Sequence, residues 1–401
     1  MIQWLFDRRN SHGFLPNLIK DETLEPNTPA WWDLALNPPF SLEFIFLKYC
    51  KLDKIPQTCT LVTDYITGTA SAYYPINLNF YDPEIDYISY MDDYSRKRLI
   101  AGDFRLLIYY SEGDNPEPEI INSIEQMCTK HKLSPDSIRF AIGNYKLKNT
   151  KPFVFFPDGE LYYRYLQILE NNYVGEQNTL KRDKKFTCLI RVDKAWRKIY
   201  GSYLYQLDVI KDGYFSYIGY KYKTSHTGLD DIDQWENFDD TLKQDVLSFE
   251  LKTPIRCDDL SDEDHNNHKL VNHDYYQNAY FNFVVETHFD DDTIYLTEKT
   301  FKPILNLQPF IVIGNPGTLA LLKDLGYKTF EDVIKETYDK QTDHRDRMSS
   351  LLKISFDLCR LSDKHHLRIQ SIIRDVLEHN QKHFLAPKVN RINTFLRELE
   401  Y

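Results

Sequence analysis

The sequence lacks the features of a disulfide-bonded, membrane-spanning or nucleic-acid-coating protein. Its six cysteines form no Cys-x-x-Cys pair and show no metal-ligand spacing, so we expect most of them to be reduced. No apolar run approaches the about 20 residues of a membrane span, and no apolar signal region opens the chain. The net charge of −11 argues against broad, nonspecific nucleic-acid binding. We therefore expect a soluble, cytoplasmic protein, of a cell or of a virus-infected host.

What the chain does contain is the length and patterning of an α/β protein with more than one domain. Its 401 residues are 42% hydrophobic and 27% charged, which is ordinary for globular proteins. Short apolar runs alternate with helical patterns, as in parallel sheets covered by helices. We expect an N-terminal α/β lobe that begins with about 60 irregular residues, then a Rossmann-like lobe and a helical tail, with bounds at 1–175, 176–345 and 346–401.

The most informative stretch, 280–330, is predicted to fold as β-α-β-α. An apolar strand ends at Glu286, and a helix begins after Thr297, its expected N-cap, with Glu298 in the first turn. Ligands of open α/β sheets bind beyond strand carboxyl ends and near helix N-termini, so this end is a candidate site. A helix start together with Lys299 suits a phosphate. Alternatively, Glu298 only complements the helix dipole and Lys299 is solvated.

Two other predicted strands also end in charged residues. In the N-terminal lobe, the strand at 105–110 leads into a polar loop with Glu112 and Asp114, which a solvated turn would also explain. In the second lobe, a basic cluster follows the strand at 185–191, and four cations there would suit a diphosphate. The alternative is a basic first helical turn, which the helix dipole slightly disfavours. The cluster consists of Arg191, Lys194, Arg197 and Lys198.

Clustered acids and histidines raise the alternative of a metal site. Hard cations prefer carboxylate ligands, and short acidic runs occur at 92–93 and 290–292. We interpret the second run as a solvated loop because it lies inside the β-α-β unit. The paired histidines fall on predicted helices without cysteine partners, so we expect them at the surface: His365, His366, His379 and His383.

Several of these segments resemble the nucleotide-binding signature of the α1,3-fucosyltransferase family. YLTEK (295–299) matches the family's Tyr-x-Thr-Glu-Lys throughout, and FVVET (283–287) stands where the family has Glu-Asn, with Thr287 in place of the usual Asn. WRKIY (196–200) is similar to the family's Arg-x-x-aromatic, and YYSEGDNP (109–116) resembles its acidic strand-end segment. The main match covers about fifty residues. Its extended forms TEKTFKPI and IGNPG are also similar to uncharacterised viral and bacterial glycosyltransferase-like proteins.

The resemblance implies a GT-B fold, with two Rossmann-like lobes and a cleft between them, no metal and no cofactor besides a nucleotide-diphosphate sugar as co-substrate. It implies an inverting, hexosyl- or fucosyltransferase-like enzyme, with GDP-linked sugars among the candidate donors. Arg197 and Lys299 would hold the diphosphate, Tyr295 and Glu298 would contact the nucleoside or sugar, and Glu286 would lie near the donor sugar. Arg191 and Thr297 complete the expected donor-binding set: Arg191, Arg197, Glu286, Tyr295, Thr297, Glu298 and Lys299.

Sugar transfer with inversion also needs a base to accept the proton of the acceptor hydroxyl. Glu112 is the first candidate and Asp114 the second. The acceptor is a glycan or a modified base in viral DNA, and a DNA base would have to reach the cleft. Two other functions stay open: a non-catalytic glycan- or nucleotide-binding protein with the same fold, and a structural assembly protein.

Overall fold

The computed structural model describes most of the chain, and all structural statements below concern these residues: 3–6, 52–55, 58–61, 65–66, 71–78, 81–110, 112–170, 173, 175–176, 180–220, 240–258 and 271–400. The irregular segment expected in the first 60 residues lies largely outside them. The chain divides into two compact units. Unit 1 comprises Met1–Tyr165 and Pro387–Tyr401, and unit 2 comprises Leu166–Ala386.

Unit 1 is built on a parallel sheet with the strand order β2-β1-β3-β4-β5-β6. The range of β4 matches the strand predicted from the apolar run at 105–110. Each strand is short, and successive side chains point to opposite faces of the sheet. The strands are β1 (Gln3–Phe6), β2 (Thr58–Leu61), β3 (Ala72–Leu78), β4 (Arg105–Tyr110), β5 (Ile138–Ile142) and β6 (Phe153–Phe155).

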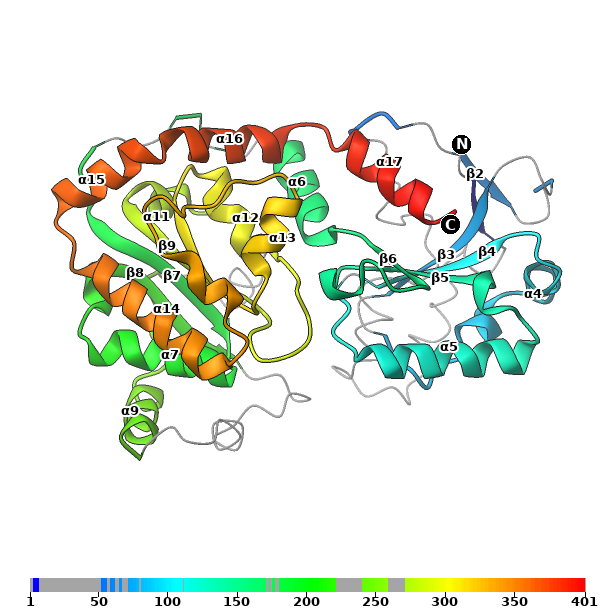
Figure 1. The fold of residues 1–401 in the computed structure, drawn as a ribbon, viewed down its shortest axis with the longest axis horizontal. Helices are drawn as coiled ribbons and strands as arrows, with labels where there is room; N and C mark the ends of the chain where they lie inside the picture. Colours follow the sequence, from blue (N-terminus) through cyan, green and yellow to red (C-terminus); the bar gives the residue numbers. More distant parts are fainter. Residues whose placement is uncertain are drawn as a thin grey trace. The chain divides into compact units, whose positions relative to one another are not determined.

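Helices cover both faces of this sheet (Figure 1). Leu106 and Ile108 of β4 pack with Ile120 of helix α5, whereas Leu107 and Tyr109 face the opposite core, so β4 is buried on both sides. A strand that is buried on both faces has a nearly continuous apolar sequence, and β4, with the sequence RLLIYY, is of this kind. The helical segments are η2 (Tyr87–Tyr90), α4 (Asp93–Ile100), α5 (Glu117–His131), η3 (Pro135–Ser137), η4 (Tyr145–Leu147), α6 (Asp158–Glu170), which runs on into unit 2, and α17 (Val389–Glu398).

The C-terminal segment of the chain belongs to unit 1. The side chains of Ile392 and Phe395 on α17, and Leu399 after it, are buried in the same core as Tyr109. The hydroxyl of Tyr73 donates to the carbonyl of Leu399 at 2.5 Å. Because these contacts join residues more than 280 positions apart, unit 1 is discontinuous in sequence.

Buried ion pairs reinforce this attachment. Glu160, which is 1% exposed, lies 3.0 Å from the ammonium of Lys388 and also pairs with Arg391. Asp53 pairs with Arg164 at 2.9 Å and accepts a hydrogen bond from the backbone of Lys388 at 2.8 Å. Buried charges are tolerated only when paired in this way, so the pairs fix where the returning segment docks.

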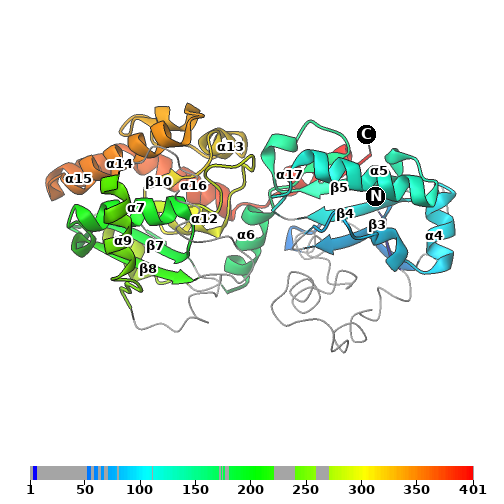
Figure 2. The same cartoon turned by 90° about the horizontal axis from the view of Figure 1, so that it is seen from below.

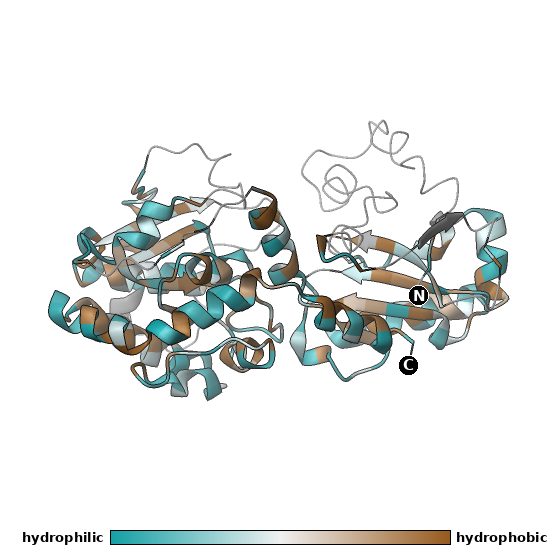
Figure 3. Cartoon of the chain, turned by 90° about the horizontal axis from the view of Figure 1, so that it is seen from above, coloured by the Kyte–Doolittle hydropathy of each residue, from teal (hydrophilic) through white to brown (hydrophobic). Residues whose placement is uncertain are grey.

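Unit 2 is built on a second parallel sheet with the strand order β10-β9-β7-β8. The strands are β7 (Lys184–Val192), β8 (Gly213–Tyr220), β9 (Ala279–Val285) and β10 (Phe310–Ile313). Figure 3 shows apolar colour along the strands of both sheets and mixed colour on the helices. The expected β-α-β-α stretch is confirmed, including Thr297 as the helix N-cap. Gly326 follows the second helix of the stretch in the left-handed conformation (φ 87°).

Helices surround the sheet of unit 2 (Figures 1 and 2). Two pairs of these helices are joined by specific side-chain contacts. Tyr200 of α7 makes a 2.6 Å hydrogen bond with Ser355 of α14, and Phe301 of α12 stacks on Phe384 of α16. The helical segments are α7 (Ala195–Gln206), η5 (Ile210–Asp212), α9 (Asp240–Glu250), α11 (His273–Gln277), α12 (Glu298–Leu305), α13 (Thr318–Asp324), η6 (Glu336–Lys340), α14 (His344–Cys359), α15 (Asp363–Ile372) and α16 (Arg374–Leu385).

The helices after residue 343 do not form a region of their own. We expected a separate tail at 346–401, but α14, α15 and α16 belong to unit 2 and α17 belongs to unit 1. Their apolar faces explain the division, because each is buried within its own unit: Phe384 of α16 packs on Phe301 of α12, and Phe395 of α17 is buried in the core of unit 1. None of the helices in the described ranges has the length and apolar character needed to cross a membrane.

One expectation about the histidines is wrong. His366 is fully buried and stacks on Tyr280 with ring centroids 4.4 Å apart and an interplanar angle of 8°. The helix carries it toward β9 because α15 packs its inner face there, and a neutral imidazole is flat enough to lie against an aromatic ring. Its neighbour His365 is exposed, as expected.

Candidate functional site

The candidate site lies where the strands β7, β9 and β10 end, side by side in the sheet of unit 2. Four segments meet the end of β9: the loop 286–297, the start of α7, the start of α12 and the turn 314–317. This is the edge at which parallel sheets bind their ligands. We call it the strand-end site.

Glu286, the residue immediately after β9, is buried and hydrogen-bonded at both carboxylate oxygens. Oε1 accepts from the Thr297 amide at 3.2 Å and from the Thr300 hydroxyl at 2.6 Å. Oε2 accepts from the Thr297 hydroxyl at 2.7 Å and from the Thr287 amide at 3.2 Å. The carboxylate thus supplies the negative charge that the N-terminus of α12 favours. Glu286 anchors the helix to the strand, and these bonds occupy the oxygens expected to face a donor sugar.

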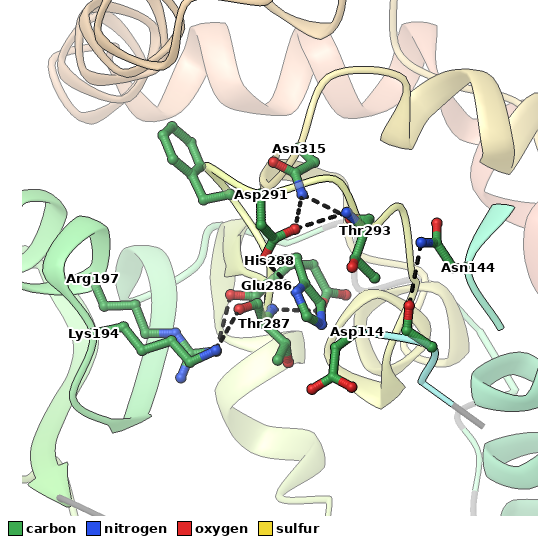
Figure 4. Close-up of polar contacts among 12 residues, drawn as sticks. Asp114, Asn144, Lys194, Arg197, Glu286, Thr287, His288, Asp291, Thr293 and Asn315 are labelled. Atoms are coloured by element: carbon green, nitrogen blue, oxygen red, sulfur yellow. Dashed lines mark hydrogen bonds and ion pairs between the residues drawn. The ribbon is translucent and has the colours of Figure 1, made fainter. Parts of the chain in front are cut away.

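Three cationic side chains converge on the dipeptide Glu286–Thr287. Arg197 donates through Nη2 to the Glu286 carbonyl at 2.9 Å, and Lys194 donates to the Thr287 carbonyl at 2.8 Å. Lys299 lies 3.5 Å from the Thr287 hydroxyl and 3.2 Å from that of Thr297. Figure 4 shows Lys194 and Arg197 approaching this dipeptide from the start of α7. The sheet therefore brings together cations that are about one hundred residues apart in sequence.

These cations differ in how open they are to solvent. Arg197 is only 3% exposed, whereas the side chain of Lys299 is 30% exposed and lies 3.4 Å from the Glu298 carboxylate. Lys194 is half-buried beside the ring of Trp196. Arg197 therefore serves to hold the strand end, and Lys194 and Lys299 are the cations that a bound anion would meet.

The fourth cation of the basic cluster does not join the strand-end site. Lys198 is 2% exposed and pairs with Asp193 at 3.2 Å and with Glu250. Burial alone would lower the pKa of Lys198, but these two carboxylates raise it above its usual value. Its charge is already matched inside the fold, so it is a structural residue.

The other expected donor-binding residues lie at or near this edge. Arg191 is half-buried near the end of β7, and Tyr295 is 9% exposed in the loop before α12. Lys302 lies one turn beyond Lys299 on α12. Burial lowers the pKa of Lys302, Glu298 partly offsets this, and the neighbouring ammonium of Lys299 lowers it further. Lys302 therefore lies in the last turn of α12, and both its burial and Lys299 disfavour its charged form, so it adds little positive charge at the start of the helix.

The loop after β9 contains a histidine–carboxylate pair that sequence reasoning missed. His288 is 6% exposed, and its Nδ1 lies 2.6 Å from Oδ2 of Asp291. The other oxygen of Asp291 accepts from the Thr293 amide at 2.8 Å and from the Asn315 side chain at 2.7 Å. Burial alone would raise the pKa of Asp291, but its hydrogen bonds to His288, Thr293 and Asn315 hold it below the usual value. Figure 4 shows the contacts of Asp291 with Thr293 and Asn315.

A buried arginine holds this loop against the turn after β10. Arg347 of α14 is 1% exposed and donates to the carbonyls of Gly314 at 3.2 Å, Gln341 at 2.6 Å and Phe289. Its guanidinium also lies over the ring of Phe289. Arginine suits this position because its planar fork offers five donors to several carbonyls at once. The only sequence signal for the pair was the run THFDDD, which we interpreted as a solvated loop.

The two carboxylates expected to act as the base lie in unit 1, just after β4. Glu112 is half-buried and Asp114 is exposed. Between them, Gly113 has φ +71°, and its carbonyl accepts from Asn144 at 3.2 Å. The Tyr110 hydroxyl accepts from the Asp114 amide at 3.2 Å. The turn that carries Asp114 is therefore tightly defined by its backbone.

The acidic runs considered as metal sites have other contacts. Asp92 caps α4 by accepting from the Ser95 amide at 2.7 Å, and Asp93 pairs with Arg96. Within the described ranges, no group of three or more histidine, cysteine or acidic residues is placed to bind a metal. Four cysteines in the described ranges are free thiols: Cys128, Cys188, Cys257 and Cys359.

No protein-family model, no curated protein and no solved structure matches the chain.

Proposed function

We propose that the protein is an inverting glycosyltransferase with a GT-B fold, which binds a nucleotide-diphosphate sugar at the strand-end site of unit 2 and transfers the sugar to a hydroxyl. The observation that carries this proposal is the convergence of Lys194, Arg197 and Lys299 on Glu286–Thr287. A cationic edge beyond parallel strands is suited to phosphates. The resemblance of YLTEK to the fucosyltransferase signature supports the same assignment, with GDP among the candidate nucleotides.

In this proposal the chain supplies mainly positive charge. Lys194 and Lys299 donate charge-assisted hydrogen bonds to the diphosphate oxygens, and these bonds strengthen as negative charge develops on the leaving group. Arg197 keeps the end of β9 in place through the Glu286 carbonyl. Glu286 positions α12, and thereby Lys299, instead of contacting the sugar.

Binding of nucleoside diphosphates tests the donor site. We expect GDP or UDP to raise the melting temperature of the parent protein in buffer that contains EDTA, and ribose or free guanosine to have no such effect. The variant Lys299→Gln should weaken this binding about 10- to 100-fold, because one charge-assisted hydrogen bond contributes about 1.5–3 kcal/mol. Lys382→Gln is the matched control, since that side chain is 79% exposed on α16. If neither diphosphate binds the parent protein, the proposal is wrong.

A second function, non-catalytic binding of a nucleotide or glycan, is favoured by one observation. The carboxylate of Glu286 is fully engaged by α12, so it is not free to act on a donor sugar. In that case the diphosphate binds, but none of the GDP- or UDP-linked sugars is hydrolysed or transferred. Glu112→Gln and Asp114→Asn would then leave binding unchanged, whereas in a transferase the loss of the true base removes turnover.

A further inference from the structure

His288 is a buried, titratable residue of the strand-end site, and one of its two ring nitrogens has no hydrogen-bond partner among the described residues. Its Nδ1 is bonded to Asp291, but its Nε2, which is shielded from water, has no hydrogen-bond partner in the described part of the chain. Burying a polar nitrogen without a partner costs free energy. Such a group at a ligand-binding edge indicates that a ligand supplies the missing partner.

The contact with Asp291 determines which nitrogen carries the proton. A carboxylate oxygen only accepts hydrogen bonds, so the neutral imidazole must be protonated at Nδ1. Nε2 then bears the lone pair and can accept a proton. A carboxylate that fixes the tautomer in this way also stabilises the imidazolium formed after proton transfer.

The pair is held rigidly by three different elements. Thr293 and Asn315 fix the second oxygen of Asp291, and Asn315 also donates to the Thr293 carbonyl at 2.7 Å. Arg347 ties the carbonyl of Phe289, the next residue after His288, to α14. A proton acceptor needs this kind of support, because its geometry determines its efficiency.

The position of His288 relates it to the cations of the donor site. It follows Thr287, the residue that Lys194 and Lys299 contact, so the histidine and the cations share one strand end. Figure 4 shows His288 beside Glu286 and Thr287. A diphosphate bound by those lysines would place the attached sugar within the same region of unit 2.

We propose that His288 is the general base of the reaction and that Asp291 is its positioning residue, an inference that rests on the proposed function. The acceptor hydroxyl gives its proton to Nε2 as its oxygen forms the bond to the anomeric carbon. The bond between that carbon and the diphosphate oxygen breaks, and the diphosphate leaves with the electron pair. Water in place of the acceptor gives hydrolysis of the donor by the same step. This assigns to His288 the role that the sequence assigned to Glu112 or Asp114.

The tautomer can be tested without any donor. Protein labelled with ¹⁵N-histidine should show an imidazole signal, protonated at Nδ1 and unprotonated at Nε2, that is missing from His288→Gln. The signal of His273, whose Nδ1 lies 2.6 Å from the side-chain oxygen of Asn306, should remain. In Asp291→Asn, the amide can donate to the ring, so the preference for Nδ1 protonation should be lost. A His288 signal protonated at Nε2 in the parent protein overturns the proposal.

Turnover then separates this inference from the proposed function. With GDP- and UDP-linked sugars and water as acceptor, we expect release of free diphosphate to fall at least 100-fold in His288→Gln, while GDP or UDP binding stays within twofold. His365→Gln, an exposed histidine on α15, is the matched control. Asp291→Asn should lower turnover less than His288→Gln does, and Asp292→Asn should not lower it.

Each other result has a distinct meaning. Unchanged turnover in His288→Gln overturns the role of His288 and leaves the donor site intact. A parent protein that binds the diphosphate but hydrolyses no donor overturns the base and supports the non-catalytic function. A parent protein that binds no diphosphate overturns the proposed function itself, and the base with it.

Discussion

The hydroxyl of Thr297 lies 2.7 Å from a carboxylate oxygen of Glu286, eleven residues earlier in the chain. This contact joins the two ends of the loop between β9 and α12. It thereby fixes the backbone position from which the side chain of Lys299 extends. It also explains why a carboxylate stands at the end of a buried strand: its charge is balanced by the start of a helix.

Replacing this carboxylate should destabilise unit 2. Glu286→Gln keeps the size of the side chain but turns one oxygen into a donor that faces other donors. We expect the free energy of unfolding to fall by about 2–3 kcal/mol, as for the loss of hydrogen bonds to a charged group. Urea unfolding measures it. Glu331→Gln, whose side chain is 68% exposed, is the control and should change stability by less than about 0.5 kcal/mol. An equal effect of both variants would refute the anchoring role.

Arg347 should be hard to replace even by lysine. Arg347→Lys keeps the charge but cannot reach the carbonyls of Gly314, Gln341 and Phe289 together. We expect a loss of about 3 kcal/mol, because buried polar groups are left unpaired. Thermal or urea unfolding measures the loss, and Arg345→Lys on the same helix should have little effect. A stable Arg347→Lys variant would show that the loop and turn hold each other without the arginine.

His366 should make the protein sensitive to mild acid. Burial lowers its pKa to about 4, with Lys185 contributing, whereas an unfolded histidine titrates near about 6.5. Between these two pH values the unfolded chain binds more protons than the folded protein does. The contribution of neutral His366 to the free energy of unfolding is therefore fully present above about pH 6.5 and is lost as the pH falls toward 4. The difference amounts to about 3 kcal/mol. Its other charged neighbours are Asp363, Arg182 and His365.

The variant His366→Phe checks this prediction. Phenylalanine can stack on Tyr280 as the imidazole does but does not titrate. The decrease in unfolding free energy from pH 6.5 to 4 should therefore be about 3 kcal/mol smaller in the variant than in the parent protein. If both lose stability in parallel over this range, other groups cause the acid sensitivity.

Alanine substitutions at two glycines of unit 1 distinguish the cost of backbone strain from the cost of steric crowding. One of the two, Gly113, lies beside the carboxylates of Glu112 and Asp114. Both Gly102 (φ +79°) and Gly113 (φ +71°) are left-handed, but only at Gly113 would a Cβ meet a neighbour, at 2.4 Å from Cγ1 of Ile142. Gly102→Ala should cost about 1 kcal/mol and Gly113→Ala about 1–3 kcal/mol more. Equilibrium unfolding measures both. Similar losses would mean that the turn before Asp114 relaxes without cost.

Much of unit 2 could be predicted from sequence because its signals are local. The limits of β10 follow from a short apolar run between Pro309 and Gly314, and the start of α12 follows from Thr297 as its N-cap. Local signals failed in unit 1, where β3 was missed. Its segment AYYPINL contains Pro75, which argues against a central strand, yet tertiary packing buries Tyr74 and Ile76 there.

The site was only partly predictable for a different reason. The edge of the sheet follows from topology, so Arg197 and Lys299 could be placed together in advance. Which atoms they contact depends on distances between segments a hundred residues apart, and that information is not in any local pattern. His288 was missed because its partner Asp291 belongs to an acidic run that resembles a solvated loop.

Because unit 1 is discontinuous in sequence, the order of synthesis determines which unit can fold completely first. The first part of this unit emerges from the ribosome before unit 2, but Ile392, Phe395 and Leu399 emerge after it. At about 5–20 residues per second, the intervening stretch of about 220 residues takes about 10–45 s to synthesise. For that time Glu160 has neither Lys388 nor Arg391 as a partner. Unit 2, although second in sequence, is therefore the first that can be completed.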